Sequence, residues 1–201
     1  TKDPEEKAGY QGMIDVLIPV AKGYITDRAF EMCSLGVQIF GGYGFTKEYP
    51  QEQLLRDCKI TQIYEGTNGI QAMDLLGRKL GLNKGQVFSN LLAEIEKTIE
   101  TAKGIETLRE LSEGLDKTLA ELKKTAKSLA GDMGSEKILT AFAFATPFLD
   151  ATGDTIMAWM HLWRAVIATE QLNGKPKKKD VDFYQGQLTT ARFFIKTVLP
   201  V

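Results

Sequence analysis

The chain has 201 residues, with 25 lysines and arginines against 26 aspartates and glutamates, and its hydrophobic content is 43%. The balanced charge gives no electrostatic argument for binding nucleic acid or a membrane surface. The hydrophobic content and the length allow a packed core in one or two domains. No apolar run is long enough to span a bilayer and no signal peptide opens the chain, so we expect a cytoplasmic protein.

Cysteine and histidine are scarce. Cys33 and Cys58 lie in helical patterns, which favours reduced thiols over a disulfide framework. His161 lies between Met160 and Trp163 on a predicted helix, and we interpret it as a packed residue rather than a catalyst. These three residues do not make a zinc ligand set, so we expect no metal. The polar opening 1–7 does not begin with methionine, and we expect a fragment of a longer protein.

No stretch alternates with the period of a strand, so the sequence predicts an all-α fold. Residues 1–9 are predicted as loop and residues 10–17 as a short helix. Pro19 suits the first turn of a long helix that ends at Phe40. The apolar stripe expected along that helix comprises Ala21, Ile25, Ala29, Cys33, Gly36 and Phe40.

Two shorter helices are predicted over residues 50–60 and 67–80. Glycines and an asparagine in the segment 81–85 indicate a boundary. We therefore predict two domains, an incomplete helical bundle over residues 1–81 and a second bundle over residues 82–201. The residues expected to face inward on the two short helices are Leu54, Leu55, Cys58, Ile70, Met73, Leu76 and Leu80.

The second domain is predicted to be an up-and-down four-helix bundle that folds on its own. Pro147 is expected to kink its third helix. The basic segment 173–179 is either a solvated turn or a contact for CoA phosphates or a partner. The four expected helices cover residues 87–102, 108–129, 136–172 and 181–198.

The candidate functional residues lie in the stretch from Gln38 to Ile70. Gly41, Gly42 and Gly44 end the long helix, because glycine accepts a positive φ without a steric cost. Glu65 follows in a loop between two helices, where an acid can face a cavity. Its neighbour Gly66 lets a ligand approach the backbone, and Thr67 or Asn68 can cap the next helix, whose free N–H groups favour anionic or carbonyl oxygens.

Four motifs in this stretch resemble the C-terminal helical domain of acyl-CoA dehydrogenases. They are Gln-x-x-Gly-Gly-x-Gly from Gln38, Glu-Tyr-Pro from Glu48, Leu-Arg-Asp from Leu55, and Tyr-Glu-Gly-Thr from Tyr64. Four motifs in this order are specific, whereas a lone glycine turn is weak evidence. The segment 68–78 and the extra helical domain resemble the branch that includes 3-methylmercaptopropionyl-CoA dehydrogenases.

The resemblance implies an oxidoreductase of fatty acid metabolism, a flavoprotein that holds FAD. Glu65 matches the base that removes the α-proton of an acyl-CoA, and its backbone N–H matches a donor to the thioester carbonyl. That role requires a dry environment that raises the pKa of the carboxyl group above about 4.3. Without the motif, Glu65 reads as a solvated loop acid. Tyr64 and Gly66 are expected to border the substrate.

The FAD contacts implied by the resemblance are Thr67, which meets the flavin or its phosphates, and Gln38, Gly41 and Gly42. The last three match a segment that contacts the ADP half of FAD held mainly by a neighbouring subunit. Without the resemblance, they are an ordinary helix end and its cap. Gly69 departs from the family, which usually has Gln or Glu there.

Other polar and aromatic residues of the stretch are given structural roles. Arg56 and Asp57 read as a surface ion pair, whereas the resemblance favours packing between helices. Tyr43, Phe45 and Tyr49 are expected to pack rather than to bind a ligand.

The resemblance also implies partners. They are an acyl-CoA substrate, further copies of the chain in a dimer or tetramer, and an electron-transfer flavoprotein. We expect the fragment alone to be inactive and to bind no FAD. The alternative is a non-catalytic helical module for oligomerisation or interaction. The departure from the family at Gly69 favours this alternative, whereas the match to the family at Glu65 and Thr67 argues against it.

Overall fold

The computed structural model describes residues 3–174 and 176–199, which form helices and turns without a strand. The predicted all-α fold is confirmed. The predictions for Thr1, Lys2 and the lysine at position 175 lie outside the described residues. Among the described helices, none combines the length and the apolar character that crossing a membrane requires.

The chain divides into two compact units. The first comprises Thr1–Phe88 with Leu129–Asp150, and the second comprises Ser89–Ser128 with Ala151–Val201. Their boundaries fall inside three helices, α5 (Gln86–Lys103), α6 (Arg109–Met133) and α8 (Ala145–Asn173). This division differs from the predicted one at Gly81, because residues 129–150 group with the first part of the chain.

The first unit begins with one continuous helical run rather than the predicted loop, short helix and long helix. It consists of α1 (Pro4–Pro19), the π-helical segment η1 (Val20–Tyr24) and α2 (Ile25–Phe40). Pro19 therefore lies inside the run and not at a helix start. Proline has no N–H to donate, and a π-helical turn directly after it is one way for a helix to continue past it.

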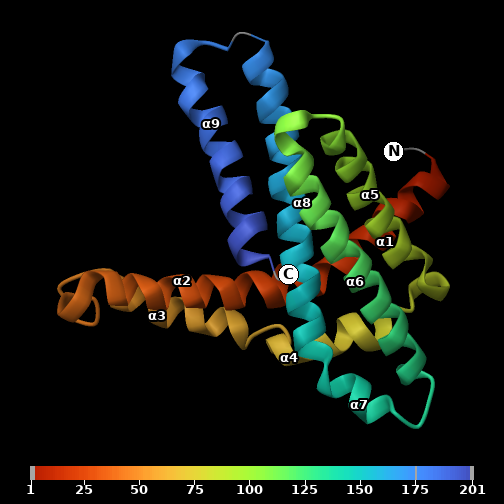
Figure 1. Ribbon diagram of the computed structural model, residues 1–201. Helices are drawn as coiled ribbons and strands as arrows, with labels where there is room; N and C mark the ends of the chain where they lie inside the picture. Colours follow the sequence, from red (N-terminus) through yellow and green to blue (C-terminus); the bar gives the residue numbers. More distant parts are fainter. Residues whose placement is uncertain (1–2, 175, 200–201) are drawn as a thin grey trace. The chain divides into compact units, whose positions relative to one another are not determined.

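The helices α2 and α3 (Gln51–Lys59) lie side by side as a hairpin (Figure 1). Near the turn of the hairpin, at the start of α3, the Gln51 side chain donates to the Cys33 carbonyl at 2.8 Å. The turn between the helices contains η2 (Gly41–Tyr43), and Pro50 immediately precedes α3. No described residue of α2 or α3 is buried, so the predicted inward stripes of these two helices are at most half-buried.

The rest of the first unit consists of short segments, and several of them contact the α1–η1 run. They are η3 (Ile60–Gln62), α4 (Asn68–Asp74), η4 (Leu75–Lys79), η5 (Leu82–Gly85) and α7 (Ile138–Ala143). Of the inward residues predicted for 67–80, Leu76 and Leu80 are buried, whereas Ile70 and Met73 are exposed. The buried apolar residues of this unit are Val16, Val20, Tyr24, Ala72, Leu75, Leu76, Leu80, Phe88, Leu129, Ala141, Ala145, Phe148 and Leu149.

The predicted helix over residues 136–172 is two helices, α7 and α8, which separate at Phe144. Pro147 lies in the first turn of α8, where a backbone N–H has no partner within the helix, so it does not kink the helix as predicted. Its neighbours Phe148 and Leu149 are buried within the first unit, and the Phe148 ring lies 6.2 Å from that of Phe88.

The second unit is a helical bundle of α5, α6, α8 and α9 (Lys178–Phe193), with η7 (Phe194–Val198) continuing α9. The sequence predicts an apolar seam along α6, and all seven of its residues are buried, namely Leu108, Leu111, Leu115, Leu119, Leu122, Ala126 and Leu129. It also predicts an apolar face on α5, of which Leu91, Ile95, Ile99 and Ala102 are buried and Val87 is half-buried.

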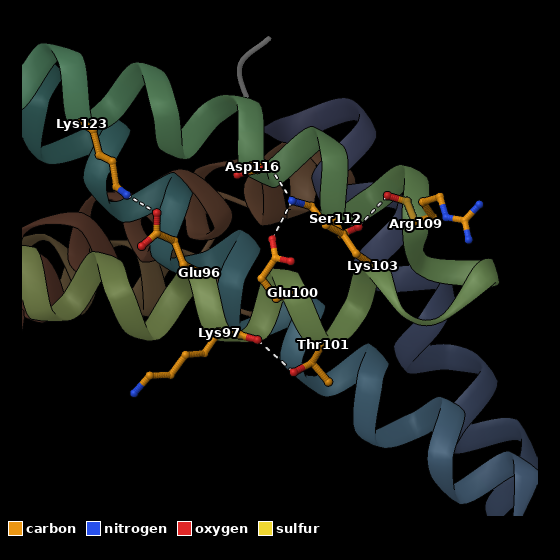
Figure 2. Close-up of polar contacts among 9 residues, drawn as sticks. All are labelled: Glu96, Lys97, Glu100, Thr101, Lys103, Arg109, Ser112, Asp116 and Lys123. Carbon is orange, nitrogen blue, oxygen red and sulfur yellow. Dashed lines mark hydrogen bonds and ion pairs between the residues drawn. The ribbon is translucent and has the colours of Figure 1, made fainter.

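Ion pairs join α5 to α6 on the polar side of this seam (Figure 2). The Lys103 ammonium contacts Asp116 at 2.8 Å and Glu100 at 2.7 Å. Hydrogen bonds to these carboxylates, to that of Asp116 first, raise the pKa of Lys103 above its ordinary value. Lys123 also pairs with Glu96, so the two helices are held in register by charge as well as by apolar packing.

Candidate functional site

The Glu65 loop, defined here as residues 63–67, joins η3 to α4. Glu65 has a φ of +54° and Gly66 a φ of +85°, so two consecutive residues lie in the left-handed region. Only glycine adopts that conformation without cost, and Glu65 is therefore a strained position. The Glu65 side chain is exposed in this chain. The backbone thus turns sharply at the residue that the sequence predicted as the base.

Thr67 ends the loop as the N-cap of α4. Its hydroxyl accepts a hydrogen bond from the backbone N–H of Ile70 at 3.4 Å, and its ψ of 159° is outside the helical region. The predicted capping role is therefore observed. Both Thr67 and the neighbouring Tyr64 are exposed, so their side chains remain accessible to a ligand.

Side chains from η1 and α2 contact the Glu65 loop and the start of α4. The Lys22 ammonium donates to the Gly66 carbonyl at 2.6 Å and to Asn68 Oδ1 at 2.7 Å. Asn68 in turn donates to Thr26 and Asp27 at 2.8 and 2.7 Å. Sequence reasoning missed Lys22 and Asp27. The available signal was a cation and an acid five residues apart on a helix otherwise interpreted by its apolar stripe.

Of the predicted FAD residues, Thr67 lies in the Glu65 loop, whereas the other three lie elsewhere. Gln38, Gly41 and Gly42 lie at the turn that ends α2, whereas the Glu65 loop is bound near Asp27 at the helix start. The rise of an α-helix puts Asp27 and Gln38 about 17 Å apart along the axis. The structure therefore separates the two predicted groups, one at each end of α2.

The turn after α2 exposes its backbone. Gly41 has a φ of +60° and caps the helix through an N–H bond to the Gln38 carbonyl. A Cβ on Gly41 or Gly42 would meet no atom within 4 Å, so the space beside both glycines is open. Gly44 differs, because a Cβ there would lie 2.3 Å from the Val37 carbonyl oxygen. Gly44 is thus needed for close packing, and Gly41 and Gly42 leave room for a ligand.

The remaining predicted residues have local roles. Arg56 pairs with Glu52 at 2.7 Å, not with Asp57, which contacts Gln53 instead. The rings of Tyr43 and Tyr49 lie 5.2 Å apart, and both remain partly exposed.

His161 lies in the second unit, away from the predicted site residues in the sequence. Its half-buried ring lies 4.9 Å from that of Phe194. Burial first, and the charge of Arg164 second, lower the pKa of His161 below its ordinary value. These contacts match the predicted packed role. Among residues 3–174 and 176–199, no cluster of His, Cys, Asp and Glu could hold a metal ion.

Two family models match the chain over different residues. "Acyl-CoA dehydrogenase, C-terminal domain" matches residues 6–80, and "Acetyl-CoA dehydrogenase C-terminal like" matches residues 91–201. The chain belongs to the acyl-CoA dehydrogenase family.

Curated relatives match over nearly the whole chain. The chain is 37% identical over 200 residues to a 3-methylmercaptopropionyl-CoA dehydrogenase of Ruegeria pomeroyi, covering 98% of this chain and 33% of that protein. It is 34% identical over 197 residues to a butyryl-CoA dehydrogenase of Syntrophomonas wolfei, covering 98% and 32%. A broad-specificity linear acyl-CoA dehydrogenase of Mycobacterium tuberculosis is 31% identical over 192 residues, covering 93% and 31%. The chain therefore spans about a third of the length of these relatives.

Proposed function

We propose that this chain supplies the catalytic base and part of the cofactor site of an FAD-dependent acyl-CoA dehydrogenase. The observation that carries the proposal is Glu65, an exposed carboxylate on a strained, anchored turn that matches the family motif. Because the chain spans a third of its relatives, the activity is that of a longer parent protein, and the chain alone is expected to be inactive.

Glu65 takes the α-proton of the acyl-CoA thioester. The α C–H is a very weak acid, so the developing enolate oxygen needs hydrogen-bond donors aimed at it. The Glu65 backbone N–H is one such donor, and a left-handed turn at this residue fixes its direction relative to the carboxylate. Parts of the parent outside this chain are expected to cover Glu65 and raise its basicity by excluding water.

The turn after α2 fits the predicted contact with FAD. Its exposed glycine backbone, with open space beside Gly41 and Gly42, accepts a flat or extended ligand at close range. Gln38 is exposed at the same helix end and offers an amide. When bound in the parent, FAD accepts the β-hydrogen as hydride. The resemblance assigns Gln38, Gly41 and Gly42 to an FAD held mainly by a second subunit, and their position at the other end of α2 from the anchored Glu65 loop is compatible with that assignment.

The substrate class is an acyl-CoA thioester. The partners that follow are further copies of the parent in a dimer or tetramer, and an electron-transfer flavoprotein that takes up the electrons. The names of the relatives include a sulfur-containing acyl group, a butyryl group and linear acyl groups, and no described residue of this chain selects among them.

The substitution Glu65→Gln in the parent tests the base. We expect flavin bleaching by acyl-CoA under anaerobic conditions to fall at least about a hundredfold, within the range of lost acid–base catalysis. FAD content is expected to be unchanged, because the carboxylate is not assigned to the flavin. Glu113→Gln, an exposed acid on α6, is the matched control. Normal bleaching by Glu65→Gln would refute the assignment.

The second candidate function is a helical oligomerisation module without catalysis. The exposed apolar residues of the α2–α3 hairpin favour it, among them Ile39 at 83% and Phe45 at 72% exposure. Surfaces of this kind bind partners. The two candidates separate in the same experiment, because a parent that binds no FAD and bleaches with no acyl-CoA supports only the module.

A further inference from the structure

Both ends of the Glu65 loop are tied to one stretch of helix, from Lys22 to Asp27. On the incoming side, the Gln62 amide donates to Asp27 Oδ1 at 2.5 Å. On the outgoing side, the Asn68 amide donates to the same oxygen at 2.7 Å. One carboxylate therefore accepts from the residue before the loop and from the residue after it. The spacing of the loop ends is set by α2.

Lys22 adds a second tie, to the loop itself. Its ammonium lies 2.6 Å from the Gly66 carbonyl oxygen and 2.7 Å from Asn68 Oδ1. Lysine can only donate, and the Gly23 carbonyl, which accepts from Asn68 Nδ2 at 3.1 Å, can only accept. These partners fix the orientation of the Asn68 amide. The interaction is charge-assisted, and such hydrogen bonds are stronger than neutral ones.

Two consecutive carbonyl groups of the loop are held at the same time. The Glu65 carbonyl accepts from Gln71 Nε2 at 3.1 Å, and the Gly66 carbonyl accepts from Lys22. These are the two residues of the Glu65 loop with positive φ. A strained backbone persists only where its surroundings hold it. With both carbonyls engaged by α4 and η1, the peptide planes that carry Glu65 cannot rotate freely.

We infer that Lys22, acting with Asn68 and Asp27, is a positioning residue that holds the Glu65 carboxylate and its backbone N–H in their working direction. The catalytic consequence rests on the proposed function. Lys22 does not touch the substrate in this assignment. It acts through the Gly66 peptide, and small errors in the position of a base reduce the rate strongly.

Hydrogen exchange on the chain itself tests the geometry without any activity. The reporters are the amides of Ile70 and Gln71, which bond to Thr67. We expect Lys22→Met to speed their exchange by about tenfold, the factor that corresponds to 1.4 kcal/mol. Lys124→Met, at an exposed lysine of α6, is the matched control and is expected to leave both rates unchanged. Equal rates in Lys22→Met and wild type would overturn the inference.

A second variant protects the test from a simple folding defect. Asn68→Ser keeps a small polar residue beside Thr67 but releases the bonds to Thr26 and Asp27. It is expected to change the same two amides in the same direction. Circular dichroism identifies a variant that has not folded. If the folded one of the two variants keeps wild-type exchange, the inference fails.

The parent protein tests the catalytic consequence. We expect Lys22→Met to lower the rate constant of flavin bleaching by about ten- to a hundredfold. The acyl-CoA concentration at half-maximal rate and the FAD content are expected to stay near those of wild type. A merely structural role would instead lower FAD content and rate together, which would also overturn the inference.

The Glu65→Gln variant separates the two proposals. Loss of bleaching in Glu65→Gln together with a wild-type rate constant in Lys22→Met refutes the positioning role and leaves the proposed function intact. Bleaching that persists in Glu65→Gln refutes the proposed function. In that case the exchange rates of Ile70 and Gln71 still decide whether Lys22 holds the loop.

Discussion

At the scale of single residues, the proposed base Glu65 has an unusual backbone conformation. Its φ of +54° is unfavourable for a residue with a Cβ, and neighbouring Gly66 shares the left-handed conformation at +85°. The strain is compensated by hydrogen bonds from Gln71 and Lys22 to the two carbonyl groups. The motif proposes Glu65 from its type and spacing, and its positive φ, which Asn83 and Lys84 share, is an added observation in favour of that proposal.

His161 provides a pH-dependent prediction at the same scale. Its folded-state pKa is lowered by burial and by Arg164, so below about pH 6.5 the unfolded chain binds more protons than the folded one. The neutral ring therefore contributes stability that is lost as pH falls through 6.5 and below. We expect His161→Gln to become more stable relative to wild type as pH is lowered from 8 to 5, with no pH-dependent difference above about 7.5.

Urea unfolding of the wild-type chain and of His161→Gln across this pH range measures the difference. The carboxylates titrate in both proteins, so their contribution cancels. A difference in unfolding free energy that stays constant with pH, or that favours wild type in acid, would contradict the assigned shift.

At the scale of elements, the turn after α2 contains glycines with opposite roles. A Cβ on Gly44 would lie 2.3 Å from the Val37 carbonyl oxygen and 2.8 Å from Val37 Cα, both backbone atoms. We expect Gly44→Ala to lower the free energy of unfolding by about 1–3 kcal/mol, the range for overpacking. Gly42→Ala, with no atom within 4 Å, is expected to change it by less than about 0.5 kcal/mol.

Thermal and urea unfolding of both variants decide the point. In the parent, Gly42→Ala is also expected to weaken FAD binding, because its added methyl group occupies the open space beside the backbone. Equal stability losses in the two variants would mean that the turn relaxes around Gly44 and that close packing is not its role.

At the scale of the whole molecule, the α2–α3 hairpin predicts self-association. Because the first bundle is predicted to be incomplete, the sequence leads us to expect exposed apolar surface at five residues. Of these, Ile70 is 49% exposed, whereas Met13, Leu17, Cys33 and Val37 are half-buried. The larger exposed side chains lie instead near the turn, where Ile39 is 83% exposed. We expect the chain to form dimers or larger species, because clustered exposed apolar side chains favour association with another protein surface.

Light scattering at increasing protein concentration measures this association. Ile39→Lys is expected to weaken it. Leu139→Lys, at an equally exposed position of α7, is the control for the added charge and is expected to have less effect. A strict monomer at all concentrations would contradict the prediction.

The chain alone is also expected to bind no FAD. Tight FAD binding by the chain alone would show that Gln38, Gly41, Gly42 and Thr67 contribute more to the FAD site than we assign to them.

The sequence alone determined the helical class, the seam of α6 and the candidate base. Seven apolar positions from Leu108 to Leu129 repeat with helical spacing, and burial at that spacing needs no information from elsewhere in the chain. The Tyr-Glu-Gly-Thr motif likewise located Glu65 from local order, and Thr67 caps α4 as its side chain predicts. Local periodicity and short-range capping are encoded within a few turns of helix.

Only the tertiary structure decided what surrounds these elements. The sequence predicted a helix start at Pro19, yet the helix continues past it through a π-helical segment. It predicted a kink inside a helix at Pro147, yet Pro147 lies in the first turn of α8. The contacts of Lys22 with Gly66 and of Asp27 with Asn68 join residues more than thirty-five positions apart. Sequence spacing cannot reveal such contacts, because they depend on how α2, α3 and α4 return to one another. The separation of Gln38, Gly41 and Gly42 from Thr67 likewise depends on how these helices pack.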